Sequence, residues 1–186
     1  MPRVIAGQAG SVPLFSPDRR LTRPTSDKAK GALFSILSGR MPVSGFLDLY
    51  AGSGQIGLEA ASRGCQDIVL VEKAAAAVRC IQQNLTKTGL TETCNVIQSS
   101  CASACRRLVR EERQFSIIFM DPPYQIARRE VETLAPLITR LLRPDGLLIV
   151  EQNSSDESLP FVMNLQRSRR CQYGAAMLSF YQAETA

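Results

Sequence analysis

The sequence predicts an α/β protein with a mostly parallel seven-stranded sheet, helices on both faces and a C-terminal antiparallel hairpin. From residue 45 onward, short apolar runs alternate with longer amphipathic ones. Alternation of this kind is typical of right-handed βαβ crossovers, which build a parallel sheet covered on both faces. The last two apolar runs flank Gly174 with no helix between them, and this arrangement favours a hairpin.

The expected elements follow one another in a regular order. The expected strands are 45–50, 67–72, 94–97, 115–120 and 147–151, then 167–173 and 175–182 in the hairpin. The expected helices between the strands are 55–63, 74–86, 100–110 and 130–142. Nearer the start, we interpret residues 3–6 as a short strand and residues 28–37 as a helix with Thr25 or Ser26 as its cap. We therefore divide the chain into a basic N-terminal extension, residues 1–40, and a main domain, residues 41–186.

Length and composition restrict the class of protein. A chain of 186 residues with 45% hydrophobic and 21% charged residues can form one substantial core. No apolar run approaches the roughly 18 residues of a membrane helix, and the first ten residues lack the apolar centre of a signal peptide. We expect a soluble, cytoplasmic protein with no membrane partner and no obligate protein partner.

The cysteines and the missing histidine narrow the chemistry. The six cysteines form no C-x-x-C pair, and the chain contains no histidine, so we expect no metal site. Cys101 and Cys105 lie one helical turn apart, and we interpret them as small residues packed on a helix. Without histidine, the commonest general base and the Ser-His and Cys-His nucleophile pairs are excluded.

The positive charge is concentrated at the start of the chain. Residues 1–40 hold seven Lys or Arg and two Asp, a net charge of +5, whereas fifteen basic and fifteen acidic residues follow. A basic segment of this kind is either a solvated surface or a contact for a polyanion such as nucleic acid.

A glycine-rich turn follows the first strand of the main domain. Its sequence, Gly52-Ser53-Gly54-Gln55-Ile56-Gly57, has the spacing of a dinucleotide-binding turn, and Glu72 ends the next strand twenty residues after Gly52. Glycines let the backbone approach a ligand closely, and an acid at that strand end can accept hydrogen bonds from ribose hydroxyls. The pattern therefore predicts an adenosine-containing cofactor.

Asp48 helps to choose among such cofactors. Its carboxylate, four residues before Gly52, would repel a pyrophosphate but suits a cation. S-adenosyl-L-methionine carries an ammonium and a sulfonium group, so it fits Asp48 better than a nicotinamide dinucleotide does.

The stretch Asp121-Pro122-Pro123-Tyr124 comes directly after an apolar strand. Two prolines cannot continue a sheet, so a stiff turn must hold the acid and the aromatic ring at the strand's carboxyl end. In open α/β sheets, ligands bind at that edge. A carboxylate and a backbone carbonyl fixed there can accept the hydrogens of an amine, while the ring stacks on a base.

These motifs, with the segments Arg3-Val-Ile-Ala-Gly7, Arg23-Pro-Thr-Ser-Asp-Lys28 and Leu33-Phe34, resemble the RsmD family of bacterial 16S ribosomal RNA guanine-N2 methyltransferases. The resemblance implies a class I methyltransferase Rossmann-like fold, S-adenosyl-L-methionine as cofactor, and 16S rRNA or an assembling small ribosomal subunit as partner, with guanine 966 as the family's target. Departures include Ser100, where the family commonly has Asn or Asp.

The resemblance and the motifs together assign the site residues. The catalytic residues expected are Asp121, Pro122, Pro123 and Tyr124. Those expected to bind the cofactor are Asp48, Tyr50, Ala51, Gly52, Ser53, Gly54, Glu72, Lys73, Ser99, Ser100 and Asp121. Those expected to bind RNA are Arg3, Arg19, Arg20, Arg23, Thr25, Lys28 and Lys30.

Three alternatives remain open at the level of sequence. A DNA or RNA adenine-N6 methyltransferase shares the Asp-Pro-Pro-Tyr chemistry. A nicotinamide-dependent oxidoreductase fits the glycine turn alone. A non-catalytic RNA-binding module fits the basic segment, but it leaves residues 121–124 without a role.

Overall fold

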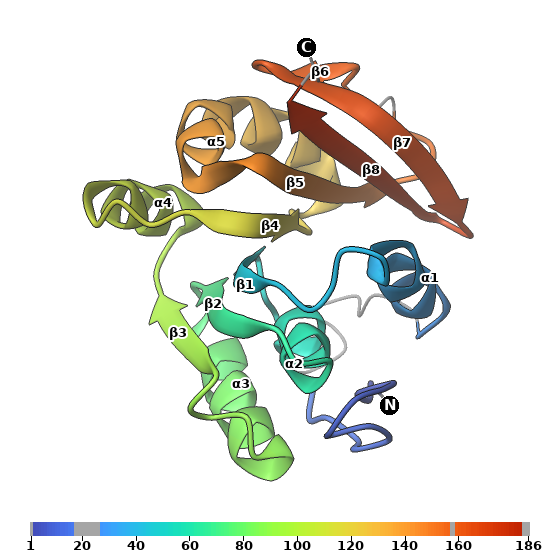
Figure 1. The fold of residues 1–186 in the computed structure, drawn as a ribbon, viewed down its shortest axis with the longest axis vertical. Helices are drawn as coiled ribbons and strands as arrows, with labels where there is room; N and C mark the ends of the chain where they lie inside the picture. Colours follow the sequence, from blue (N-terminus) through green and yellow to red (C-terminus); the bar gives the residue numbers. More distant parts are fainter. Residues whose placement is uncertain (1, 17–26, 157–158, 184–186) are drawn as a thin grey trace.

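The computed structural model describes residues 2–16, 27–156 and 159–183. Its centre is one eight-stranded sheet of order β3-β2-β1-β4-β5-β8-β7-β6 (Figure 1). Strands β1 to β5 pair in parallel, and β8, β7 and β6 follow in antiparallel pairing. The predicted mostly parallel sheet with a C-terminal hairpin is thereby confirmed. The eighth strand is the two-residue β6, which is too short to leave a sequence pattern.

The observed bounds lie close to the predicted ones. The strands are β1 (Ser44–Leu49), β2 (Gln66–Glu72), β3 (Cys94–Gln98), β4 (Phe115–Met120), β5 (Leu142–Asn153), β6 (Phe161–Val162), β7 (Leu165–Tyr173) and β8 (Ala176–Ala183). The helices are α1 (Asp27–Leu37), α2 (Gln55–Ser62), α3 (Ala75–Thr88), α4 (Cys101–Arg110) and α5 (Ala127–Leu141), with the 3-10 helix η1 (Tyr124–Ile126) before α5. The largest difference is the start of β5. Leu142 pairs with Phe115, and the ladder shifts register before Leu147 pairs with Ile117.

Side chains of successive strand residues enter two separate cores. Phe46 of β1 packs in a cluster with residues of α1, α2 and α3, whereas Leu47 packs in a cluster with residues of α4 and α5. The two groups of helices therefore cover opposite faces of the sheet (Figure 1). Cys101 and Cys105 are buried in the second cluster, which confirms their interpretation as packing residues.

The N-terminal segment is packed against the main sheet and its helices. Val4 and Leu14 are buried in the same cluster as α1 and α2. The strand predicted at residues 3–6 is wrong, because Arg3 forms only an isolated bridge to Pro13. The predicted helix at residues 28–37 is confirmed as α1, and its two candidate caps, Thr25 and Ser26, lie outside the described residues.

A buried carboxylate, Glu59 of α2, ties this segment to the fold. Its oxygens accept hydrogen bonds from the backbone N–H groups of Ile5, at 2.6 Å, and Ala6, at 3.1 Å. The Arg63 side chain donates a third bond at 2.8 Å, and the Lys30 ammonium lies 4.0 Å away. Three separate parts of the chain thus depend on one carboxylate.

Lys30 requires a correction to the predicted RNA contacts. Its side chain is 0% exposed, and its ammonium donates to the carbonyl of Arg3. Burial lowers the pKa of Lys30, while the nearby Glu59 acts in the opposite direction. The prediction that Lys30 contacts RNA is wrong, because the ammonium is used inside the protein to join α1 to the N-terminal segment.

Glu59→Ala is expected to reduce the free energy of unfolding by about 3–5 kcal/mol, because it leaves buried donors without their acceptor and removes one of the two carboxylates near the buried Lys30 ammonium. Urea denaturation measures the change. The matched control is Glu111→Ala, which removes an exposed pair with Arg107 and should cost less than about 1 kcal/mol. Equal losses in the two variants would contradict the structural role of Glu59.

Candidate cofactor and catalytic site

The predicted cofactor and catalytic residues gather at one edge of the sheet. Leu49 of β1 lies in register with Val71 of β2 and Met120 of β4. The turns that follow these parallel strands therefore leave the sheet side by side. Residues 50–54, 72–73, 99–100 and 121–124 all lie at this carboxyl edge, with Glu72 as the last residue of β2 and Tyr124 as the first of η1.

Hydrogen bonds to the Glu72 carboxylate stabilise the conformation of the glycine turn. This carboxylate accepts a hydrogen bond from the N–H of Gly52 at 3.0 Å and from the N–H groups of Lys73 and Ala74, both at 2.8 Å. Gly52 and Gly54 have positive φ angles of 57° and 79°, which side chains with a Cβ adopt at a cost. The turn thus presents backbone to a ligand, with the acid at its side.

Asp48 is buried directly beneath this turn, with 1% of its surface exposed. Its Oδ2 accepts the N–H of Gly57 at 3.0 Å, and its Oδ1 receives no hydrogen bond from the described residues. Burial raises the pKa of Asp48 to about 7, although the Gly57 bond acts against this rise. A Cβ on Gly57 would lie 2.1 Å from Leu70 Cδ2, so the close approach of α2 to the sheet requires glycine there.

Two other predicted cofactor contacts have structural roles. Tyr50 has a positive φ of 66°, and its hydroxyl donates a hydrogen bond to Glu130 of α5. Ser100 caps α4, because its hydroxyl accepts the N–H of Ser103 at 3.3 Å. Contacts from these two residues to a cofactor would therefore come mainly from the backbone.

The other residues predicted to bind the cofactor lie at the same edge of the sheet. Ser99 donates its N–H to the carbonyl of Glu72 at 3.0 Å, which joins the third turn to the second. The side chain of Lys73 is exposed. Ala51 and Ser53 are buried within the glycine turn.

Glu151 is a site residue that the sequence interpretation missed. Met120 pairs with Val150, so the next residues, Asp121 and Glu151, follow on neighbouring strands. Glu151 is 3% exposed. Burial raises the pKa of Asp121 well above its ordinary value, and the charges of Glu151 and Asp48 raise it further. The sequence could have indicated Glu151, because it is an acid at the end of a predicted buried strand, as Asp48 and Glu72 are.

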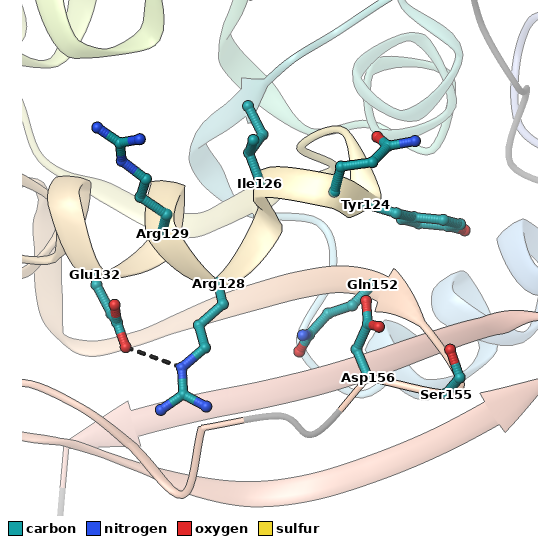
Figure 2. A pocket seen from close by; sticks show the side chains of 9 residues that line it. Tyr124, Ile126, Arg128, Arg129, Glu132, Gln152, Ser155 and Asp156 are labelled. Carbon is teal, nitrogen blue, oxygen red and sulfur yellow. Dashed lines mark hydrogen bonds and ion pairs between the residues drawn. The ribbon is translucent and has the colours of Figure 1, made fainter.

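The turn 121–124 opens onto a pocket of about 510 Å³. Pro122 is buried, Pro123 is exposed, and Tyr124 begins η1 at the mouth of the pocket. Tyr124 and Arg128 line one side, and Gln152 and Asp156 line the other (Figure 2). Of the four residues of the motif, Tyr124 is the one that lines this space.

The predicted RNA contacts are only partly visible. Arg3 and Lys28 are exposed, and Arg3 pairs with Asp27 at 3.3 Å. Arg19, Arg20, Arg23 and Thr25 lie outside the described residues. Within the described ranges, no cluster of three potential metal ligands occurs, and no helix combines the length and hydropathy needed to cross a bilayer.

The sheet order and the carboxyl-edge site define a class I S-adenosylmethionine-dependent methyltransferase fold. An RNA methyltransferase of Salinibacter ruber, solved with S-adenosyl-L-homocysteine, superposes with a TM-score of 0.65 over 88% of this chain and 96% of its own, at 14% identity. A hypothetical protein of Thermus thermophilus gives a TM-score of 0.84 at 31% identity, with coverage of 98% of this chain and 100% of its own.

The chain belongs to the family described as conserved hypothetical protein 95, the RsmD family, whose model matches residues 2–182. It is 31% identical to ribosomal RNA small subunit methyltransferase D of Escherichia coli (strain K12), over 98% of this chain and 90% of that protein. It is also 31% identical to the YlbH protein of Bacillus subtilis (strain 168), over 97% and 98%. These findings confirm the resemblance and leave the nicotinamide alternative without support.

Proposed function

We propose that this protein transfers a methyl group from S-adenosyl-L-methionine to the exocyclic N2 amine of a guanine in small-subunit ribosomal RNA. The substrate is 16S rRNA, free or in an assembling small subunit, in the cytoplasm. The observation that carries the proposal is the turn 121–124, which follows β4 and places an acid and a ring at the carboxyl edge of the sheet, next to the strand β1 that carries Asp48. The name of the Escherichia coli relative supports the choice of RNA.

The residues at the edge fit this cofactor. Asp48 is buried with one oxygen lacking a hydrogen bond from the described residues, and a cationic ammonium would satisfy it, directly or through water. The Glu72 carboxylate would accept further hydrogen bonds from the ribose hydroxyls of the cofactor. Ser99 or Ser100 would contact the edge of its adenine. When bound, the cofactor supplies an electrophilic methyl group on sulfur.

Residues 121–124 would prepare the amine. The lone pair of a guanine amine is delocalised into the ring, so the amine is a poor nucleophile. The Asp121 carboxylate and the Pro122 carbonyl would accept its two hydrogens and favour a tetrahedral nitrogen whose lone pair is free. Pro122 and Pro123 would fix these acceptors in place, while Tyr124 would stack on the base after it leaves the RNA stack.

The charge changes in the reaction match the surroundings of Asp121. Methyl transfer from the sulfonium of the cofactor would place positive charge on the amine nitrogen, which would then have to release one of its protons. A carboxylate stabilises that charge and can take or relay the proton. The raised pKa of Asp121 makes it a better proton acceptor than an exposed aspartate.

The experiment that tests the proposal is methyl transfer from labelled cofactor to small subunits from cells that lack the enzyme. Nucleoside mass spectrometry of the product should show N2-methylguanosine at one site. N6-methyladenosine would overturn the choice of base and favour the adenine alternative. No transfer to RNA, despite cofactor binding, would overturn the RNA substrate.

Arg23→Ala is expected to weaken RNA binding by about tenfold at physiological salt and to reduce the salt dependence of binding, because one phosphate contact is lost. Cofactor affinity should stay nearly unchanged. Filter binding at several salt concentrations measures the first effect, and a cofactor titration measures the second. A matching loss of cofactor affinity would assign Arg23 to the cofactor pocket or the fold.

A further inference from the structure

The hairpin of β7 and β8 carries positive charge that no acid of its own balances. Residues 159–183 contain three arginines and no acidic residue, whereas the rest of residues 41–186 hold twelve basic and fifteen acidic residues. Two of these arginines, Arg169 and Arg170 of β7, are exposed and form no ion pair with the described residues. A local excess of cations on an otherwise slightly acidic domain indicates either a contact with a polyanion or a solvated surface.

The two guanidinium groups lie on opposite faces of one strand. Arg169 pairs with Phe180 of β8, on the face covered by α1, and successive side chains of a strand point to opposite faces. The Nε of Arg169 donates to Cys171 Sγ, and the Nε of Arg170 donates to Met177 Sδ, both at 3.1 Å. Sulfur is a weak acceptor without charge, and a guanidinium has five N–H donors. Both groups therefore keep their charge and further donors for a ligand.

The outer side of β7 is open along residues 168–173, which we call the β7 strip. β6, the outermost described strand, pairs only with Leu165 and Gln166 of β7. The backbone groups on the outer side of the β7 strip therefore pair with no strand in the described part of the chain. Exposed backbone N–H groups and guanidinium groups are both good donors to phosphate oxygens.

The β7 strip ends close to the turn to which we assign catalysis. Asn153, the last residue of β5, pairs with Ala176, and Ala176 pairs with Tyr173 at the end of β7. The hairpin tip therefore lies at the same edge of the sheet as the ends of β4 and β5 (Figure 1). Three strand spacings separate β4 from β7, a distance of about 14 Å. One RNA strand can thus contact both the turn 121–124 and the β7 strip.

We propose that the β7 strip binds the single-stranded RNA next to the target guanine; this inference rests on the proposed function. Arg169 and Arg170 donate to phosphates from the two faces of the strand. Tyr173 is partly exposed and packs against the core cluster that also holds residues of α1, so the core fixes its ring while one part stays open. That ring stacks on a base at the end of the strip nearest the turn 121–124.

The combination of side chains suits this partner. Single-stranded nucleic acid is commonly held by cationic groups that follow its backbone and by aromatic rings on which its bases stack. The target base must leave its RNA stack, so the neighbouring nucleotides are unpaired or easily unpaired. Phosphate contacts position the RNA and carry little sequence information. The β7 strip therefore orients the strand, and the choice of base stays with the turn 121–124.

The test measures binding of small ribosomal subunits from cells that lack the enzyme, at several salt concentrations. Arg169→Gln/Arg170→Gln removes two charges from exposed positions. We expect this variant to bind about 30-fold more weakly at physiological salt and to reduce the salt slope by about 1.4, the value for two phosphates of a single strand. Cofactor affinity, melting temperature and kcat at saturating subunits should stay nearly unchanged.

Two further variants separate stacking from charge. Tyr173→Leu keeps an apolar side chain against the core and removes the ring, so binding should weaken by about tenfold, the loss of one stacked base, with an unchanged salt slope. The matched control Arg106→Gln/Arg110→Gln removes the same charge from exposed positions of α4. Figure 1 shows α4 on the left and the hairpin tip on the right. This control should leave affinity and salt slope nearly unchanged.

The outcomes separate this inference from the proposed function. Unchanged RNA binding in Arg169→Gln/Arg170→Gln would overturn the inference, and self-association of that variant would then assign the arginines to the protection of an open sheet edge. Equal weakening in the α4 control would reduce the effect to net charge and overturn the inference as well. Wild-type enzyme that binds small subunits without forming N2-methylguanosine would overturn the proposed reaction, and the binding comparison would still decide this inference. Wild-type enzyme that binds no RNA would overturn both.

Discussion

Asp121→Ala is expected to reduce kcat for methyl transfer by about 1,000-fold or more, while cofactor affinity changes by less than about tenfold. The variant removes one of the two acceptors that fix the amine hydrogens. It also removes the negative charge that faces the nitrogen as the nitrogen becomes positive. Because the carboxylate acts mainly on the amine, binding of the cofactor at Asp48 and Glu72 should largely survive.

Single-turnover rates with labelled cofactor and small subunits measure the loss, and calorimetric titration measures cofactor binding. Asp121→Asn keeps the shape and one acceptor oxygen but not the charge, so its rate should lie between those of the wild type and Asp121→Ala. The control Asp145→Ala removes an exposed carboxylate far from the turn and should be fully active. Unchanged activity in Asp121→Ala would contradict the catalytic role of the motif.

Asp48→Asn is expected to stabilise the cofactor-free protein at pH 8 and to weaken cofactor binding at the same pH by about 100-fold, the loss of one buried charged contact. The asparagine Oδ1 can still accept the N–H of Gly57, so the local structure should be kept. The substitution removes the free-energy cost of an ionised carboxylate inside the protein. It also removes the attraction of that carboxylate for the cofactor's ammonium.

The pH dependence of this effect follows from the raised pKa of Asp48. In the unfolded chain the carboxyl loses its proton near 3.8, whereas in the folded protein it holds the proton up to about 7. Between these values the unfolded state binds fewer protons, so wild-type stability falls as the pH rises from about 4 to about 7. The difference in the free energy of unfolding between Asp48→Asn and wild type should therefore grow over this pH range. It should reach at most about 4 kcal/mol and stay constant at higher pH.

Urea denaturation at pH 5, 6, 7 and 8 measures the gap, with Asp145→Asn as the exposed control. Wild-type cofactor affinity should also rise from pH 6 to pH 8, because a cation binds the ionised form of Asp48. Lower stability of Asp48→Asn than of wild type at pH 8 would contradict an unsatisfied buried charge. A pH-independent cofactor affinity would contradict the ammonium contact.

The order of the elements and the position of the site were predictable from local sequence. Apolar runs of strand length, glycines at residues 52, 54 and 57, and the prolines at 122 and 123 act on the backbone within a few residues of themselves. Their effects can therefore be recognised from a short stretch of the sequence around each of them. The rule that ligands bind at the carboxyl edge of parallel strands then brings Asp48, Glu72 and Asp121 together without coordinates.

Contacts between distant parts of the chain were decided only by the tertiary structure. The net charge of residues 1–40 gave no sign that Lys30 is inside the protein, because its burial depends on Glu59 in another helix. Glu59 in turn is 54 residues from Ile5, whose N–H it accepts, and Tyr50 is 80 residues from Glu130.

The same reason explains the site residues that sequence interpretation passed over. Glu151 and Gln152 differ from other polar residues at strand ends only through the register of β4 and β5. That register turns one side chain toward the other acids and the next into the pocket beside Tyr124. By itself the sequence determined the fold, the cofactor class and the position of the turn to which we assign catalysis, since these follow from local backbone chemistry. The tertiary structure decided which polar side chains are buried and what each one faces, because burial is set by residues far away along the chain.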